Sequence, residues 1–78
     1  MKHIKVKFFG VLSEVTGKQE EDIVFEGNLD ELLNLLKQKY PDIAGISFSA
    51  AINQEINGAK NELSDGDEVA LLPPFTGG

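Results

Sequence analysis

Apolar and polar residues alternate in four stretches of the chain, and this period of two is typical of β-strands with one buried face. The stretches cover residues 3–9, 22–26, 46–52 and 68–72. In the first stretch Ile4, Val6 and Phe8 share one face, and Phe9 falls on the other. The polar run over residues 19–22 is expected to be a solvated edge ahead of the second strand.

A helix is predicted between the second and third strands. Four leucines follow the i, i+3, i+4, i+7 spacing of a helix that packs on a sheet: Leu29, Leu32, Leu33 and Leu36. Asn28 and Glu31 have the spacing of an N-terminal capping pair, and Pro41 is expected to end the helix. A shorter helical turn is predicted over residues 11–16, closed by Gly17.

This order of strand, strand, helix, strand and strand in 78 residues predicts an α+β fold of the β-grasp, or ubiquitin-like, type. In it a mixed sheet of about four to five strands packs on one main helix, and the first and last strands lie side by side in the centre. We predict a single folded domain over residues 1–72. A flexible C-terminal tail over residues 73–78 is expected to follow it.

The predicted tail has an unusual composition, which combines two prolines with two glycines: Pro73, Pro74, Phe75, Thr76, Gly77 and Gly78. Adjacent prolines stiffen the backbone and prevent its continuation as a helix or central strand. Glycines without a Cβ can thread a narrow channel in a partner. We therefore interpret residues 73–77 as a threading segment that presents the α-carboxylate of Gly78. The alternative is an ordinary disordered terminus.

Charge and composition narrow the classes of partner. The net charge of -6 disfavours nucleic acid and anionic membranes and favours a basic protein surface. Since there is no cysteine, the chain has no disulfide, thiolate ligand or thiol nucleophile of its own. The absence of an apolar signal or membrane-spanning stretch predicts a cytoplasmic protein.

The side chains do not form a recognisable catalytic or metal-binding motif. His3 is expected to face solvent on the first strand. Asp65-Gly66-Asp67 is interpreted as a turn, because the remaining positions of a calcium loop are missing. Phe9, Leu72 and Phe75 point away from the predicted core, and together they could form an apolar patch at the base of the tail that binds a partner.

The carboxylate of Gly78 is the remaining candidate for chemistry. A carboxylate is a poor electrophile, so its use as a carrier requires activation, typically to an acyl-adenylate formed from ATP. A persulfide nucleophile then leads, after reduction, to a thiocarboxylate. A thiol followed by a lysine amine leads instead to a protein conjugate, and the residues alone leave both routes open.

Three segments resemble the small subunit of molybdopterin synthase: Lys-Val-Lys-Phe-Phe-Gly at residues 5–10, Ala-Ile-Asn-Gln at residues 51–54, and residues 63–70 running into the Pro-Pro-Phe-Thr-Gly-Gly ending. The resemblance implies that a ubiquitin-activating-like adenylyltransferase adenylates Gly78 with ATP and that a sulfur donor protein converts it to a thiocarboxylate. This carrier would be a non-catalytic subunit with no stably bound cofactor or metal.

The resemblance further implies a partner. The tail would insert into the large synthase subunit, in a complex of two small and two large subunits, and donate sulfur to cyclic pyranopterin monophosphate. By position, the contact surface would comprise Phe9, Ile56, Leu72 and Phe75. Two alternatives remain open, a ubiquitin-like modifier joined to lysines through Gly78 and a sulfur carrier for another thiolation pathway. A plain binding module is a third.

Overall fold

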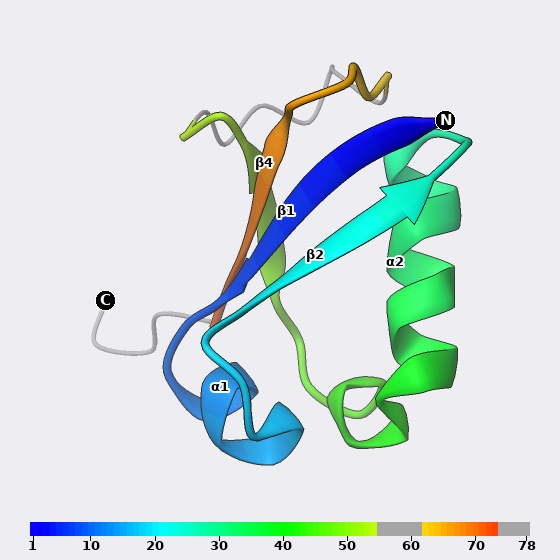
Figure 1. Ribbon diagram of the computed structural model, residues 1–78. Coiled ribbons are helices and arrows are strands. Elements are labelled where there is room, and N and C mark those ends of the chain that lie inside the picture. The colour runs from blue at the N-terminus through cyan, green and yellow to red at the C-terminus, as the bar shows by residue number, and fades with distance from the viewer. Residues whose placement is uncertain (55–61, 74–78) are drawn as a thin grey trace.

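The computed structural model describes residues 1–54 and 62–73 and shows a four-stranded sheet in the order β2-β1-β4-β3 (Figure 1). The strands are β1 Lys2–Phe8, β2 Glu20–Phe25, β3 Ser49–Ile52 and β4 Glu68–Leu72. β1 runs antiparallel to β2 and parallel to β4, and β3 runs antiparallel to β4. The first and last strands are therefore neighbours in the centre of the sheet, which confirms the predicted mixed β-grasp arrangement.

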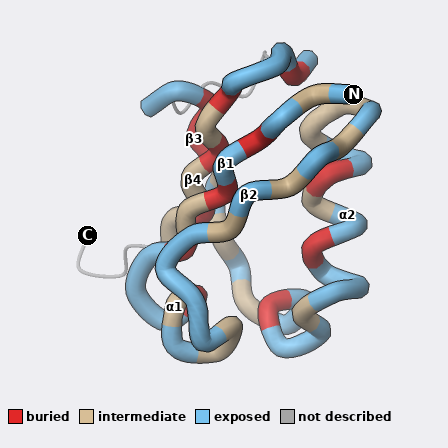
Figure 2. Tube along the Cα trace, in the orientation of Figure 1, coloured by how far each residue is buried: buried red, intermediate tan, exposed pale blue. Residues whose placement is uncertain are grey.

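Three helical segments accompany the sheet: α1 Val11–Thr16, α2 Leu29–Lys39 and the 3-10 helix η1 Pro41–Ile43. α2 lies across one face of the sheet, and α1 lies at the end of the sheet where β1 and β4 finish (Figure 1). Buried residues concentrate between the sheet and α2 (Figure 2). They form one cluster: Ile4, Val6, Phe8, Leu12, Leu32, Leu36, Ile43, Ile52, Leu63, Val69 and Leu71.

The predicted helix ends are confirmed. The Asn28 side chain accepts a hydrogen bond from the backbone N–H of Glu31 at 2.9 Å. The Glu31 carboxylate accepts one in return from the N–H of Asn28 at 3.0 Å. This capping box satisfies two backbone donors at the start of α2, and Pro41 follows directly after the C-cap residue Tyr40. Gly17 ends α1 in the left-handed conformation, also as predicted.

Two strand boundaries differ from the prediction. β3 is shorter, since it begins at Ser49 instead of residue 46. β2 begins at Glu20 instead of residue 22, and the solvated edge predicted over residues 19–22 holds for its exposed members but is wrong for Glu21. Glu21 pairs with Val6 of β1, and its side chain is only 10% exposed. A charged side chain is tolerated at this mostly buried position because residues at the end of α2 donate hydrogen bonds to it.

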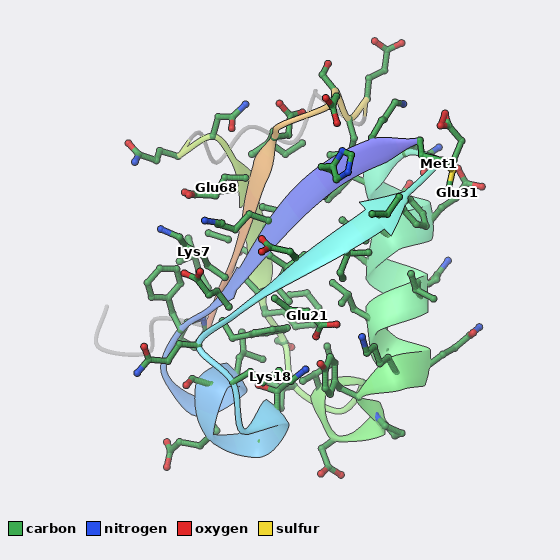
Figure 3. All side chains as sticks on the ribbon, viewed as in Figure 1. Met1, Lys7, Lys18, Glu21, Glu31 and Glu68 are labelled. Carbon is green, nitrogen blue, oxygen red and sulfur yellow. The ribbon has the colours of Figure 1, made fainter. Side chains whose placement is uncertain are left out.

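Those partners surround the Glu21 carboxylate, which lies below β2 near Lys18 (Figure 3). It accepts hydrogen bonds from the Lys39 ammonium and the Tyr40 hydroxyl, both at the end of α2. Lys18 Nζ lies 3.4 Å from the same carboxylate. Burial alone would raise the pKa of Glu21, but the hydrogen bonds from Lys39 and Tyr40 and the two lysine charges lower it overall.

This cluster predicts a pH dependence. Because the pKa of Glu21 is lower in the folded protein than in the unfolded chain, its contribution to stability is present above the unfolded pKa and is lost as the pH falls. We expect Glu21→Gln to reduce the free energy of unfolding by about 1.5 kcal/mol at neutral pH, the scale of a hydrogen bond to a charged group. Urea denaturation at several pH values measures the difference, which should shrink as the pH drops below the ordinary carboxyl range.

Glu20→Gln is the matched control. Its carboxylate lies on the outward face of the sheet, 3.7 Å from Lys5 Nζ, with half of the side chain exposed. Exposed ion pairs contribute little, so this variant should keep nearly the wild-type stability. An equal loss in both variants, or a loss for Glu21→Gln that is independent of pH, contradicts the role assigned to Glu21.

Candidate functional site

The base of the predicted tail is held by the two central strands. Leu71 of β4 is fully buried, and its carbonyl accepts a hydrogen bond of 3.2 Å from the N–H of Phe9. This bond extends the parallel ladder of β1 and β4 past the last residue of β1. Pro73 therefore follows a central strand that is hydrogen-bonded to β1 up to Leu71.

Phe9 and Leu72 lie next to each other on the outward face of the sheet. Phe8 of β1 pairs with Leu71 of β4 in the parallel register. The next residues in the two segments, Phe9 and Leu72, are therefore also neighbours. Phe9 is 44% exposed and Leu72 is partly buried. Ala70 precedes Leu72 on the same face of β4, and the residue opposite Ala70 on β1 is Lys7. We call Phe9 and Leu72 the apolar pair.

Of the other predicted site residues, the structure places Pro73 alone. Pro73 is partly buried beside the apolar pair. The remaining residues with predicted roles lie outside the described part of the chain: Ile56, Pro74, Phe75, Thr76, Gly77 and Gly78. The threading, interface and acyl-carrier roles of these residues stay predictions, as does the domain boundary after residue 72.

The sequence reasoning missed a contact between Gly10 and Pro73. A Cβ atom at position 10 would lie only 2.9 Å from Cγ of Pro73 and 3.7 Å from its Cβ and Cδ. The proline ring thus occupies the space that a side chain at Gly10 would need. The break in alternation after Phe9 signalled a turn, but nothing local indicated that a residue more than sixty positions later would pack against it.

Charged side chains on the outward face are paired with one another. Lys7 Nζ lies 3.2 Å from the Glu68 carboxylate, between β1 and β4 (Figure 3). Lys5 Nζ lies 3.7 Å from the Glu20 carboxylate, between β1 and β2. Both lysines are therefore accompanied by an acidic group, and Phe9 presents an exposed apolar side chain at the end of β1.

The acidic turn is structural, as predicted. Asp67 is 7% exposed, and its carboxylate accepts hydrogen bonds from the Asn53 amide at 2.9 Å and from the N–H of Ser64 at 2.7 Å. Asp65 accepts hydrogen bonds from the N–H of His3 and lies 3.1 Å from the His3 ring, and these contacts lower the pKa of Asp65. His3 itself is exposed.

Over residues 1–54 and 62–73, no group of three or more histidine, cysteine, aspartate or glutamate side chains could hold a metal ion. The helices in the same part of the chain are too short or too polar to cross a bilayer. What the described residues provide is a hydrogen-bonded base for the tail, with the exposed side chain of Phe9 beside it.

Comparison with known proteins identifies relatives of this chain. The model of the ThiS family matches residues 6–78. A protein of Caenorhabditis briggsae named molybdopterin synthase sulfur carrier subunit is 36% identical, with 100% of both chains covered. The protein of the same name in Escherichia coli strain K12 is 32% identical, with 96% of this chain and 99% of the relative covered.

Solved structures show the same fold. A Pyrococcus furiosus protein matches with a TM-score of 0.87 at 23% identity, over 96% of this chain and 100% of the other. Subunit 1 or 2 in a Helicobacter pylori complex of molybdopterin-converting factor matches at 30% identity and a TM-score of 0.70, over 97% and 99% of the two chains. Small archaeal modifier protein 1 of Methanosarcina acetivorans matches at 28% identity and a TM-score of 0.80, over 100% and 98%.

Proposed function

This chain belongs to the ThiS family, and from that membership we propose that it is the sulfur-carrier subunit of a molybdopterin synthase. The observation that carries the proposal is the full-length match to relatives that bear this name. The geometry supports it, because the tail starts from a central strand beside an exposed apolar pair. A carrier needs such a rigid body to present a reactive end to successive partners.

The carrier chemistry proceeds at Gly78. The terminal carboxylate attacks the α-phosphate of ATP on an adenylyltransferase and releases pyrophosphate. A persulfide sulfur of the donor protein then attacks the acyl carbon and displaces AMP. Cleavage of the resulting acyl disulfide by a thiol leaves a thiocarboxylate on Gly78. The thiocarboxylate sulfur attacks a carbon of cyclic pyranopterin monophosphate and displaces an oxygen substituent from it. Water then cleaves the acyl–sulfur bond, which leaves the sulfur on the pterin and regenerates the Gly78 carboxylate for another round.

The partners follow from this scheme. The large synthase subunit receives residues 73–78 and supplies the catalytic side chains, in a complex of two small and two large subunits. A relative from Helicobacter pylori was solved as a complex of subunits 1 and 2 of molybdopterin-converting factor, which supports a partner of this kind. ATP is used by the activating enzyme, so the carrier itself keeps no cofactor. The carrier cycle takes place in the cytoplasm, and neither nucleic acid nor a membrane is among the partners of the chain.

A second function has a specific observation in its favour. One solved relative, at 28% identity, is named small archaeal modifier protein 1. A ubiquitin-like modifier would share the adenylation step and then transfer Gly78 to a lysine amine of another protein. Service to a different thiolation pathway would share the thiocarboxylate but deliver the sulfur elsewhere.

Intact-protein mass spectrometry tests the proposal. The chain isolated from cells that make the pterin cofactor should contain a fraction in which sulfur replaces one oxygen at the C-terminus. Incubation of that fraction with the large subunit and the pterin precursor should consume the thiocarboxylate and yield the dithiolene. Target lysines that carry the C-terminal peptide of this chain in isopeptide linkage, residues 61–78 after tryptic digestion, would instead establish the modifier function if no thiocarboxylate is present.

Phe9 provides a prediction about the partner surface. Replacing Phe9 by Ala removes an exposed aromatic side chain at the base of the tail, where an interface would be desolvated on binding. We expect the Kd for the large subunit to rise about 30-fold, which corresponds to a hot-spot loss of about 2 kcal/mol. Isothermal titration calorimetry with the purified large subunit measures this change.

Val24→Ala is the control for Phe9→Ala. Val24 is also an exposed apolar residue on a strand, but it lies on the edge strand β2, where it pairs with His3 away from the apolar pair. Its replacement should leave the affinity close to the wild-type value. Equal effects of the two substitutions would place the interface elsewhere.

A further inference from the structure

The Pro73 ring lies against Gly10, and we call this contact the seat of Pro73. The seat defines where the tail leaves the folded body. With a Cβ at position 10 only 2.9 Å from Pro73 Cγ, a real side chain would force the ring or the backbone to move. Real non-bonded carbon contacts are closest to optimal at about 3.5–4.0 Å. The absence of a side chain at Gly10 is therefore what lets the base of the tail lie directly against the turn after β1.

Gly10 is itself held firmly. Its backbone has φ 58° and ψ -132°, a conformation that glycine adopts readily and L-residues avoid. Its carbonyl accepts hydrogen bonds from the N–H of Ser13 at 3.0 Å and of Glu14 at 3.4 Å, at the start of α1. The fully buried Leu12 anchors that helix in the core. The seat is thus part of the rigid body and cannot follow the tail if the tail shifts.

The position of the seat matters because only five residues follow Pro73. Residues 74–78 can span at most about 18 Å when fully extended, at roughly 3.6 Å per residue. A change in direction at Pro73 therefore changes the region that the terminal carbon can reach. Reacting groups must meet within a fraction of an ångström of the productive geometry, so a misdirected base lowers the fraction of productive encounters.

We propose that Gly10 is a positioning residue for the acyl-carrying tail, whose missing side chain admits the Pro73 ring and so aims Gly78 at the sites of its partners. This inference rests on the proposed function, since it concerns the direction in which the carrier presents its carboxylate. Gly10 does not touch the reacting atoms and acts only through Pro73.

A spin label at the end of the tail tests the positioning without reference to any enzyme. The sequence has no cysteine, so Gly78→Cys creates a unique site for the label. Paramagnetic broadening of backbone amides then shows which part of the body the tail end visits. We expect Gly10→Ala to redistribute this broadening over the surface. Pro73→Ala, which removes the Cγ in contact and leaves Gly10 unchanged, should cause a similar redistribution even if Gly10→Ala fails to fold.

Gly17→Ala is the matched control for backbone strain. Gly17 also has a positive φ, 74°, but a Cβ there would meet no atom within 4 Å. Both glycine substitutions should therefore lower the melting temperature, whereas only Gly10→Ala should move the label pattern. A pattern for Gly10→Ala and Pro73→Ala that coincides with that of wild type and Gly17→Ala overturns the inference.

Loading kinetics connect the positioning to the carrier reaction. In the full chain without the label, Gly10→Ala should reduce kcat/KM for adenylation about tenfold or more, because small misplacements cost large factors in rate. The double variant with Pro73→Ala should lose no more than the larger single loss, since both changes remove the same contact. Fully multiplied losses overturn the inference. A wild-type chain that is never adenylated overturns the proposed function instead, while the label experiment still decides where Gly10 directs the tail.

Discussion

Removal of Gly78 is expected to abolish the carried sulfur completely. The shortened chain ends in Gly77, one residue short of the position at which an activating site would hold the acyl carbon, and about 3.5 Å cannot be recovered by a stiff proline stem. Intact-mass spectrometry should detect no thiocarboxylate, and pterin dithiolene formation should fall to background in cells that lack another carrier. Sustained dithiolene formation under those conditions would refute the assignment of Gly78.

Extension of the chain by one alanine beyond Gly78 is the matched control. It retains every native residue but moves the free carboxylate away from Gly78 and adds a Cβ next to it. We expect the same loss of thiocarboxylate as in the deletion, with an unchanged melting temperature. Normal loading of the extended chain would show that the activating enzyme does not select the terminal glycine.

Replacement of Leu36 by Ala in α2 should produce a large loss of stability. Leu36 is completely buried between α2 and the sheet. Truncation of such a leucine costs about 2–5 kcal/mol, because the cavity left behind collapses only in part. A domain of this size has roughly 4–12 kcal/mol in total, at about 0.05–0.15 kcal/mol per residue. Urea or guanidinium denaturation should show a clearly lower midpoint.

The neighbouring Leu35 provides the control on the same helix. Its side chain is 37% exposed, so Leu35→Ala removes a residue of equal size and helix propensity with much less loss of buried contact. Its free energy of unfolding should change by less than about 1 kcal/mol. Equal losses at the two positions would mean that α2 packs through a different face from the one observed.

The secondary structure of this protein could be predicted because its signals are local. The alternation of Ile4, Val6 and Phe8 in β1 needs only neighbouring residues to be recognised. The same holds for the leucines of α2, which recur with the helical period, and for its capping pair Asn28 and Glu31. The family could also be inferred from contiguous segments, since motifs such as residues 63–70 keep their spacing along the chain.

Predictions failed where a contact joins residues far apart in sequence. Glu21 lies in a run of acidic residues that indicated solvent exposure, yet the end of α2 brings Lys39 and Tyr40 to its carboxylate. A charge can be tucked inward when hydrogen bonds replace the lost water. The seat of Pro73 on Gly10 is also a contact between residues far apart in sequence. Each of the two residues by itself indicates only a turn or a break in a strand.

The sequence by itself determined the elements, their order, the family and the composition of the last residues, because hydrophobic period, capping residues and contiguous motifs are written along the chain. Only the tertiary structure decided that Phe9 lies beside Leu72, that Glu21 is enclosed and that Pro73 rests on Gly10. The first and third features arise from the pairing of β1 with β4, and the second arises from contacts between β2 and the end of α2. They depend on side-chain packing between elements that are distant in sequence. The pattern of residues along the chain does not say which of these side chains will be in contact.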